Sequence, residues 1–310
     1  MKKILLCSDG STFAENTYRY GAWFAERLKA EEVDVLYVSD IRAQQASKQN
    51  LSGSIGIDAK ETLLNRLVEL EHEKAKINHQ QTKLVLQEAA KTLKAEGVDR
   101  INLLHETGFL VDCLEKFEAS CDLVVLGKRG EAAEFASGHL DANLERIVRS
   151  SHKPCLVTSR QFKPIERVSI AYDGSPSSQK ILQFIADSSI FAGLELHIVT
   201  VARSVAEQTA IARIESAKQR LQQAGFEPVC SVLEGHSEKA IQRGLGGHMR
   251  LKPLSHERLN QEAISNYVTE RDISLLVMGA YGHSRIRYLV IGSTTAQMLR
   301  SCHIPVLLFR

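Results

Sequence analysis

The sequence lacks a long apolar run. No stretch approaches the roughly 18 apolar residues that would indicate a membrane-spanning helix. The N-terminus, MKKILLCSDGS, has two lysines and a short apolar segment, which reaches Ser8 and Asp9 after about four residues. That segment is too short for the apolar region of a secretory signal peptide. We therefore expect a cytoplasmic protein that does not bind a membrane.

An excess of charge of one sign is also missing. The chain has 39 basic and 37 acidic residues, a net charge of +2, so charge alone indicates no nucleic acid or other polyanionic partner. The cysteines are scattered without a CxxC pair, and most lie in or beside apolar runs, which predicts free buried thiols in a reducing compartment. They are Cys7, Cys113, Cys121, Cys155, Cys230 and Cys302.

Familiar catalytic and metal-binding patterns are absent too. There is no GxxxxGK[ST] phosphate loop, no GxSxG nucleophile elbow and no HExxH helix. The spacing of His236, His248 and His256 matches no zinc template, so we expect no metal site. Since no catalytic residue can be identified, we expect ligand binding with slow or no turnover rather than efficient catalysis.

What the sequence does contain is an internal repeat. The 310 residues suffice for two domains. The segment Ile4–Ser11 matches Val168–Ser175, and each is an apolar strand that ends in Asp-Gly-Ser. Helix-patterned sequence follows in both halves, over Thr12–Lys29 and Pro176–Phe191. A repeat of this kind predicts two similar domains in tandem.

Each half continues as short apolar strands that alternate with helical segments. The remaining strands are predicted at 33–38, 101–105, 123–127 and 154–158 in the first half, and at 196–201, 229–233, 275–279 and 305–309 in the second. Five such strands per half indicate an α/β fold of two doubly wound parallel sheets. We place the domains at 1–160 and 165–310, joined by a short polar connector that contains Pro164.

The most informative stretch is GAYGHSRIRYLVIGSTT, from Gly279 to Thr295. It follows the apolar strand and precedes a short helix that Ser293 and Thr294 open. Glycines let the backbone approach a ligand, and the amide groups at a helix start favour an anion. A hydroxyl-capped helix start behind a glycine-rich loop predicts a phosphate site. The alternative is a loop that only turns the chain.

The spacing Gly279-x2-Gly282-x9-Gly292-Ser293 resembles the signature of the ATP-binding branch of the universal stress protein family, as do Met278, His283 and Thr294. The resemblance covers nearly the whole chain twice, so the chain looks like a tandem universal stress protein. It implies Rossmann-like domains, similar to adenine nucleotide alpha-hydrolases, that pack as a pseudo-dimer through their last strands. It also implies ATP as ligand, with or without Mg²⁺. The implied ligand-binding residues are Asp173, Val201, Gly279, Gly282, His283, Gly292, Ser293 and Thr294.

Two of these residues have a further interpretation. The resemblance places Asp173 near the adenosine, but Asp-Gly-Ser is also turn chemistry, and Asp173 could equally be a turn or helix N-cap residue. It assigns the adenine contact at Val201 to backbone groups. Arg285 and Arg287 are further candidate cations for the phosphate region, or plain surface charges.

The first half departs from the signature. Its loop contains Gly127 and Gly130, and ten residues separate Gly130 from Asp141, which aligns with Gly292. Ala142 stands in the place of Ser293. The added negative charge and the missing hydroxyl both oppose phosphate binding, so we expect weak or no ATP binding in this half. The basic residues Lys128 and Arg129 could attract an anion or simply be solvated.

Each half also carries an extra segment. The Gln/Ser/Gly-rich residues 43–57 predict a loop, and 59–95 predict a long charged helix with room for a break into two. The second half carries 237–260, which predicts a plain surface insertion, a flap beside the nucleotide crevice or a surface for a partner.

The leading hypothesis is a cytoplasmic, homodimeric stress-response protein that binds ATP in its second half and acts as a binding or regulatory protein. One alternative is an enzyme, a slow ATPase or a self-phosphorylating protein with Ser293 or Thr294 as acceptor. Another is a carrier of a small molecule or lipid that uses the first half. The protein partner is not readable from the sequence.

Overall fold

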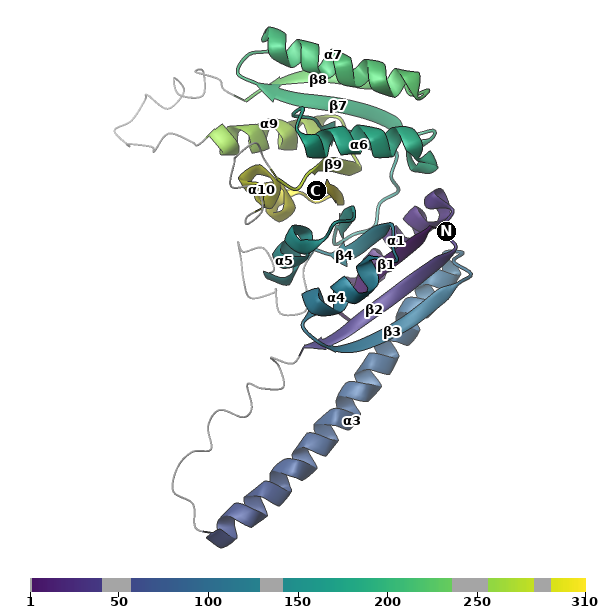
Figure 1. Cartoon of the computed structure of the whole chain (residues 1–310), viewed down its shortest axis with the longest axis vertical. Coiled ribbons are helices and arrows are strands. Elements are labelled where there is room, and N and C mark those ends of the chain that lie inside the picture. Colours follow the sequence, from purple (N-terminus) through teal and green to yellow (C-terminus); the bar gives the residue numbers. More distant parts are fainter. Residues whose placement is uncertain (1, 41–56, 129–141, 236–255, 282–290) are drawn as a thin grey trace, which may run out of the picture.

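The computed structural model describes residues 2–40, 57–128, 142–235, 256–281 and 291–310. Their strands form one ten-stranded sheet in the order β3-β2-β1-β4-β5-β10-β9-β6-β7-β8 (Figure 1). The strands of the first half are β1 Lys3–Ser8, β2 Glu32–Asp40, β3 Ile101–Gly108, β4 Leu123–Gly127 and β5 Cys155–Thr158. Those of the second half are β6 Arg167–Ala171, β7 Glu195–Ala202, β8 Val229–Glu234, β9 Leu275–Gly279 and β10 Val306–Phe309.

The sheet joins two parallel halves at one antiparallel pair. Every neighbouring pair within a half is parallel, whereas β5 and β10 run antiparallel, with Leu156 opposite Leu307. The halves therefore pair through their last strands, as the resemblance implied. This arrangement confirms the predicted α/β fold of two tandem doubly wound domains.

Helices cover both faces of the sheet. The helices of the first half are α1 Ala14–Leu28, α3 Ile57–Ala95, α4 Leu110–Glu118 and α5 Ala142–Ser150. Those of the second half are α6 Pro176–Asp187, the 3₁₀ turn η2 Ser189–Phe191, α7 Gln208–Gln223, α9 His256–Glu270 and α10 Ser293–Ser301. One core lies under α1, α3, α6 and α7, and the other under α4, α5, α9 and α10.

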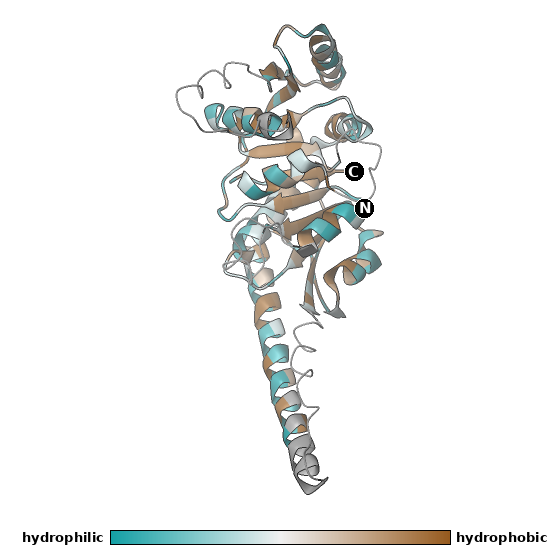
Figure 2. Cartoon of the chain, turned by 90° about the vertical axis from the view of Figure 1, so that its left-hand side faces the viewer, coloured by the Kyte–Doolittle hydropathy of each residue, from teal (hydrophilic) through white to brown (hydrophobic). Residues whose placement is uncertain are grey.

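Burial on both faces explains the character of the strands. Ile4 and Leu6 of β1 point into the first core, and Leu5 and Cys7 into the second. A strand covered on both sides has no polar face, so its sequence reads as a continuous apolar run. Figure 2, coloured by hydropathy, shows the strands as a hydrophobic layer between helices with hydrophilic outer surfaces.

Two helices differ from the sequence-based expectation. The long helix expected over 59–95 does not break in two: α3 is one helix of 39 residues, and its sequence contains neither Pro nor Gly. The helix expected over Pro176–Phe191 ends earlier, at Asp187. There Ser188 adopts an extended backbone, and its hydroxyl accepts the N–H of Ile190 to begin η2.

Candidate functional site

The strand order places a crevice at the carboxyl edge of each half. In the second half the chain proceeds from β6 outward to β7 and β8, then returns to β9 on the other side of β6. The direction in which successive strands are added to the sheet thus reverses between β6 and β9, although the two strands themselves are parallel. Ligands of doubly wound sheets bind outside the carboxyl ends of the strands at this switch point. Asp173 follows β6 and Gly279 ends β9, so both lie at that edge.

Asp173 has a local structural role. Its Oδ1 accepts the N–H of Ser175 at 2.9 Å, which closes a turn after β6. Asp9 closes the matching turn in the first half by accepting the N–H of Ser11, also at 2.9 Å. The turn interpretation of Asp-Gly-Ser is therefore present in both halves. A ligand contact by Asp173 is a separate matter and stays a prediction.

The same turn begins α6. The hydroxyl of Ser175 accepts the N–H of Ser178, and the hydroxyl of Ser178 donates to the carbonyl of Ser175. Pro176 occupies the first helical turn, where its missing N–H costs no hydrogen bond. The N-terminus of α6 is thus capped by its own side chains and held against the end of β9.

Two helix starts meet at Gly279. A Cβ added there would lie 2.7 Å from the hydroxyl oxygen of Ser177 in α6, so only glycine fits without a shift. On the α10 side, the Thr295 hydroxyl donates to the Gly279 carbonyl at 2.8 Å. The N–H of Gly292 donates to the carbonyl of Ala280 at 3.0 Å. The positive ends of two helix dipoles therefore converge at the end of β9, an arrangement that favours an anion.

The start of α10 differs in one respect from the predicted hydroxyl cap. Ser293 and Thr294 do open the helix, but the N-cap is Gly292, and no side chain of the described residues forms a cap hydrogen bond there. A glycine has no side-chain oxygen to offer the first amide groups. In α6 the Ser175 hydroxyl accepts one of the first amide groups, whereas Gly292 offers no such acceptor to α10. A bound anion could therefore accept hydrogen bonds from the first amide groups of α10.

A cation that no sequence motif predicts, Arg213 of α7, lies beside the crevice. Gly174 adopts a positive φ of 78°, and a Cβ there would lie 3.2 Å from the Arg213 side chain. Arg213 also donates to the buried Thr200 hydroxyl at 3.4 Å. In the first half the residue that packs over the matching Gly10 is Val85 of α3. The charge appears only once the fold brings α7 over the turn, because no local motif marks it.

Of the predicted residues not yet discussed, one is described by the structure and the others lie outside the described ranges. Val201 lies in β7 beside Gly235, whose N–H donates to the carbonyl of Ala202 at 2.8 Å and extends the ladder. An added Cβ at Gly235 would lie 2.6 Å from the Val201 side chain, so β7 and the end of β8 are closely packed here. Gly282 and His283 lie outside the described residues, as do Arg285, Arg287, Gly130 and Asp141.

The carboxyl edge of the sheet in the first half matches that of the second half in position but carries different residues. Ala142 is the first residue of α5 just as Ser293 is the first of α10, which agrees with the alignment of these two positions. Gly127 ends β4, and a Cβ there would meet the Thr17 hydroxyl at a relaxed 3.4 Å. Phe13, stacked under Arg160 at 4.9 Å, lines a small pocket at this edge.

The described residues just before each loop also contact the opposite half. Lys128, predicted to attract an anion or be solvated, is half-buried and donates to the carbonyl of Cys302, the C-cap of α10. In the reverse direction, the Tyr281 hydroxyl donates to the carbonyl of Arg149 near the end of α5 at 2.8 Å. Arg310 donates to the next carbonyl, that of Ser150, at 3.1 Å. Tyr281, which precedes the candidate loop, is therefore held against the other half.

The cysteines are free, as expected, and all but the half-buried Cys230 are buried. Burial raises the pKa of the Cys121 and Cys155 thiols to about 12. Both stay protonated near neutral pH and are poor nucleophiles or metal ligands. No cluster of metal-ligating side chains occurs among the described residues. His236 and His248, and the side chain of His256, lie outside them.

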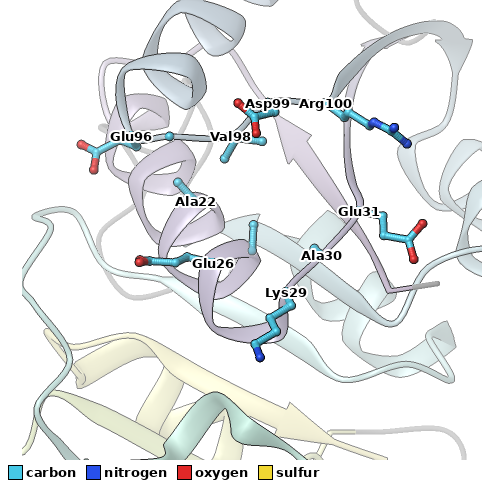
Figure 3. Close-up of a pocket in the computed structure, with 11 residues that line it drawn as sticks. Ala22, Glu26, Lys29, Ala30, Glu31, Glu96, Val98, Asp99 and Arg100 are labelled. Atoms are coloured by element: carbon cyan, nitrogen blue, oxygen red, sulfur yellow. The ribbon is translucent and has the colours of Figure 1, made fainter.

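A cavity of about 580 Å³ lies away from the carboxyl edge of the sheet and opens between the C-terminal ends of α1 and α3 (Figure 3). Its rim carries Glu31, just before β2, and Arg100, just before β3, so it lies at the amino ends of the strands. Doubly wound sheets bind ligands at the opposite edge, and we therefore do not place the candidate site in this pocket.

Within the described ranges, no helix has the length and apolar character needed to cross a membrane.

Comparisons with known proteins agree with the fold. The chain is 52% identical over 311 residues to the universal stress protein Slr1230 of Synechocystis sp., and the match covers 100% of both chains. A universal stress protein from Archaeoglobus fulgidus has a similar structure, with a TM-score of 0.64 and 19% identity over 99% of this chain and 95% of that one. One from Pseudomonas aeruginosa has a TM-score of 0.59 and 14% identity over 99% and 92%.

The two structural relatives are too distant in sequence to show more than the fold. The sequence profile of the family, in contrast, matches this chain twice, over residues 1–159 and 164–310. With this double match and a full-length relative of high identity, the chain belongs to the universal stress protein family.

Proposed function

We propose that this protein binds ATP, or another adenine nucleotide, in the crevice of its second half and acts as a cytoplasmic binding or regulatory protein in the stress response. Family membership supports the stress-response role. The observation that carries the nucleotide part is the convergence of α6 and α10 on Gly279, where a Cβ would lie 2.7 Å from Ser177. We also propose a homodimer and domain limits of 1–160 and 165–310.

The residues present fit a polyphosphate. The amide groups that follow Gly292, together with the hydroxyls of Ser293 and Thr294, would hold phosphate oxygens at the start of α10. Arg213 supplies a positive charge beside the Asp173 turn. The adenosine would lie along the carboxyl ends of β6 and β7, near Asp173 and the backbone of Val201.

The first half lacks these features at its matching positions. Ala142 opens α5 without a hydroxyl, and Val85 packs over Gly10 where Arg213 packs over Gly174. Gly127 has room that Gly279 lacks. We therefore assign one nucleotide site to each chain, in the second half.

The test is the thermal shift with Mg-ATP of the variant Gly292→Asp, which copies Asp141 of the first half. Gly292 has a φ of −53°, which any residue adopts, and aspartate is a favourable N-cap. The melting temperature of the free variant should therefore not fall. The new charge faces the phosphates, so the ATP-dependent shift should disappear, with an affinity loss of at least about tenfold, or 1.4 kcal/mol.

The matched control is Gly193→Asp. Gly193 precedes β7 at the opposite edge of the sheet, and no atom lies within 4 Å of an added Cβ. Its positive φ of 75° will cost some stability in the free protein, but the ATP-dependent shift should remain. A wild-type chain without a shift, or a Gly292→Asp variant that keeps the full shift, would contradict the proposed site.

A further inference from the structure

Hydrogen bonds in three directions hold Ala280 and Tyr281, the two residues that follow β9. The N–H of Ala280 donates to the carbonyl of Phe309 in β10 at 2.8 Å, and its carbonyl accepts the N–H of Gly292 at 3.0 Å. The third bond crosses to the first half, where the Tyr281 hydroxyl donates to the carbonyl of Arg149 in α5 at 2.8 Å. Both halves therefore contribute to the position of this segment.

Arg310 makes a second link to the same end of α5. Its Nη1 atom donates to the carbonyl of Ser150 at 3.1 Å, and its guanidinium carbon lies 5.8 Å from the centroid of the Tyr281 ring. A guanidinium over an aromatic ring within about 6 Å of its centroid is attracted to the ring. The backbone carbonyl of Arg310 in turn accepts a hydrogen bond from the Nζ of Lys180 in α6 at 3.0 Å. Arg310 thus connects α5, Tyr281 and α6.

The two donors of the second half match what the end of α5 offers. Carbonyl groups in the last turn of a helix lack an intrahelical partner, and the negative end of the helix dipole favours a cation such as Arg310. Burial raises the pKa of the Tyr281 hydroxyl, so this group stays protonated near neutral pH and remains a donor. The end of α5 therefore receives one neutral and one charged donor from the other half.

The elements that these links reach surround the proposed nucleotide site. The start of α6 lies against Gly279, and the start of α10 is bonded to the carbonyl of Ala280. Ala280 is buried, so the segment cannot shift without disturbing close-packed neighbours. Tyr281 and Arg310 therefore tie both the end of β9 and α6 to the first half.

The first half also contacts the far end of the phosphate-binding helix. Lys128, just after β4, donates to the carbonyl of Cys302, the C-cap of α10. The nine residues of α10 span about 14 Å from the proposed phosphate site to this contact. A short helix moves as a rigid unit, so a contact at its C-terminal end also restrains its N-terminal end.

We propose that Tyr281 and Arg310 are positioning residues, through which the C-terminal end of α5 in the first half fixes the phosphate end of the nucleotide site in the second half. The inference rests on the proposed function. It gives the first half a role at a site that lies in the other half, although we assign the first half no nucleotide of its own.

The first test is calorimetric titration of the Tyr281→Phe variant with Mg-ATP. The substitution keeps the ring and removes the donor, and ATP affinity should fall about three- to tenfold, the strength of one hydrogen bond. Arg310→Met, which removes the second donor, should weaken binding in the same range. The matched control is Tyr18→Phe, whose hydroxyl bonds to Ser8 within the first half. This control should lower the melting temperature and leave ATP affinity unchanged.

The second test is amide hydrogen exchange of the full chain, followed by mass spectrometry of peptides. In the wild type, Mg-ATP should slow exchange in the last turn of α5, where the N–H of Ser151 donates to the carbonyl of Ile147 at 2.8 Å. Tyr281→Phe should abolish this effect of ATP, which a hydrogen bond with a purely structural role would not change.

The outcomes separate this inference from the function on which it rests. Unchanged ATP affinity in Tyr281→Phe, or ATP binding that leaves exchange in α5 of the wild type unaffected, would overturn the positioning role and keep the nucleotide site. A wild type that binds no ATP would contradict the proposed function, and this inference with it.

Discussion

Gly279 and Gly127 occupy equivalent positions at the ends of β9 and β4, but their surroundings differ. An added methyl group at Gly279 would lie 2.7 Å from the Ser177 hydroxyl, whereas at Gly127 the nearest atom is 3.4 Å away. Gly279→Ala should therefore push α6 from β9, lower the free energy of unfolding by about 1–3 kcal/mol and weaken ATP binding. Gly127→Ala should change neither quantity by more than about 0.5 kcal/mol.

Denaturant unfolding and ATP titration of these two variants measure the difference. The pair is matched in chemistry and in position within the repeat. Equal effects of the two substitutions on ATP binding would contradict the assignment of the site to the second half.

The buried thiols predict a pH dependence of stability. The pKa of Cys155 is raised from 9.0 to about 12, mainly by burial. The unfolded chain then loses a proton between pH 9 and 12 while the folded chain does not, so this contribution is present below pH 9 and is lost as pH rises through that window. Cys155→Ala should reduce the loss of stability between pH 9 and 10 by up to about 1.4 kcal/mol per pH unit.

Urea unfolding at pH 8, 9 and 10 tests this expectation. At pH 8 the variant will already be less stable because it leaves a cavity, so the comparison uses the slope with pH and not the absolute value. An unchanged slope would mean that the Cys155 thiol ionises as readily in the folded chain as in the unfolded one.

At the residue scale, the sequence predicted what a local motif encodes. The Asp-Gly-Ser turns, Ser293 and Thr294 at the start of α10 and Ala142 at the start of α5 all follow from the repeat. Arg213 and the links formed by Lys128 and Tyr281 could not be predicted in the same way. Each depends on a partner far away in the sequence, which only the folded sheet brings into contact.

At the scale of elements, α5 and α10 tie the halves together at their C-terminal ends. Lys128 places a positive charge on the C-cap of α10, and Tyr281 donates to the end of α5. A cation at a helix C-terminus is favourable because the dipole is negative there. Lys128→Met, which keeps the apolar stem of the side chain, should lower the free energy of unfolding by about 0.5–1.5 kcal/mol.

Chemical denaturation of Lys128→Met measures this loss, with Lys163→Met in the connector as a control for a removed lysine charge. Lys163 donates its backbone N–H, and not its side chain, to the Tyr20 hydroxyl, so its substitution should be nearly neutral. A loss no larger for Lys128→Met than for the control would show that the side-chain contact contributes nothing.

The type and approximate position of each helix and strand were predictable from the sequence, whereas the residues at which they begin and end were less so. Every described strand was expected near its observed position because strands buried on both faces are plain apolar runs. A long helix was expected over 59–95, but average helix length left open a break into two, and the absence of Pro and Gly from 57–95 decides for continuity. The early end of α6 depends on Ser188, whose hydroxyl begins the following 3₁₀ turn. Nothing in the sequence distinguishes Ser188 from the other serines as a capping residue.

At the scale of the whole molecule, β5 and β10 make one sheet from two halves. Leu156 and Leu307 face one another across this junction, and both are fully buried. Leu156→Ala should lower the free energy of unfolding by about 2–5 kcal/mol. Because the junction is continuous with both cores, the two halves should unfold in one transition.

The single tryptophan gives a direct check of cooperativity. Trp23 lies in α1, so its fluorescence reports on the surroundings of that helix, whereas far-UV circular dichroism reports on the helices and strands of both halves. The two signals should give coincident denaturation curves in the wild type. Separate transitions would show that the halves are thermodynamically independent in spite of the shared sheet.

Calorimetric titration of the wild-type full chain with Mg-ATP counts the nucleotide sites on the protein directly. We predict one site per chain, because among the described residues the uncapped start of α10, the crowded Gly279 and Arg213 occur together in the second half. Two sites per chain would show that Ala142 and Val85 do not prevent binding in the first half. An absence of binding heat at several temperatures would contradict the nucleotide site and leave the family membership and the fold in place.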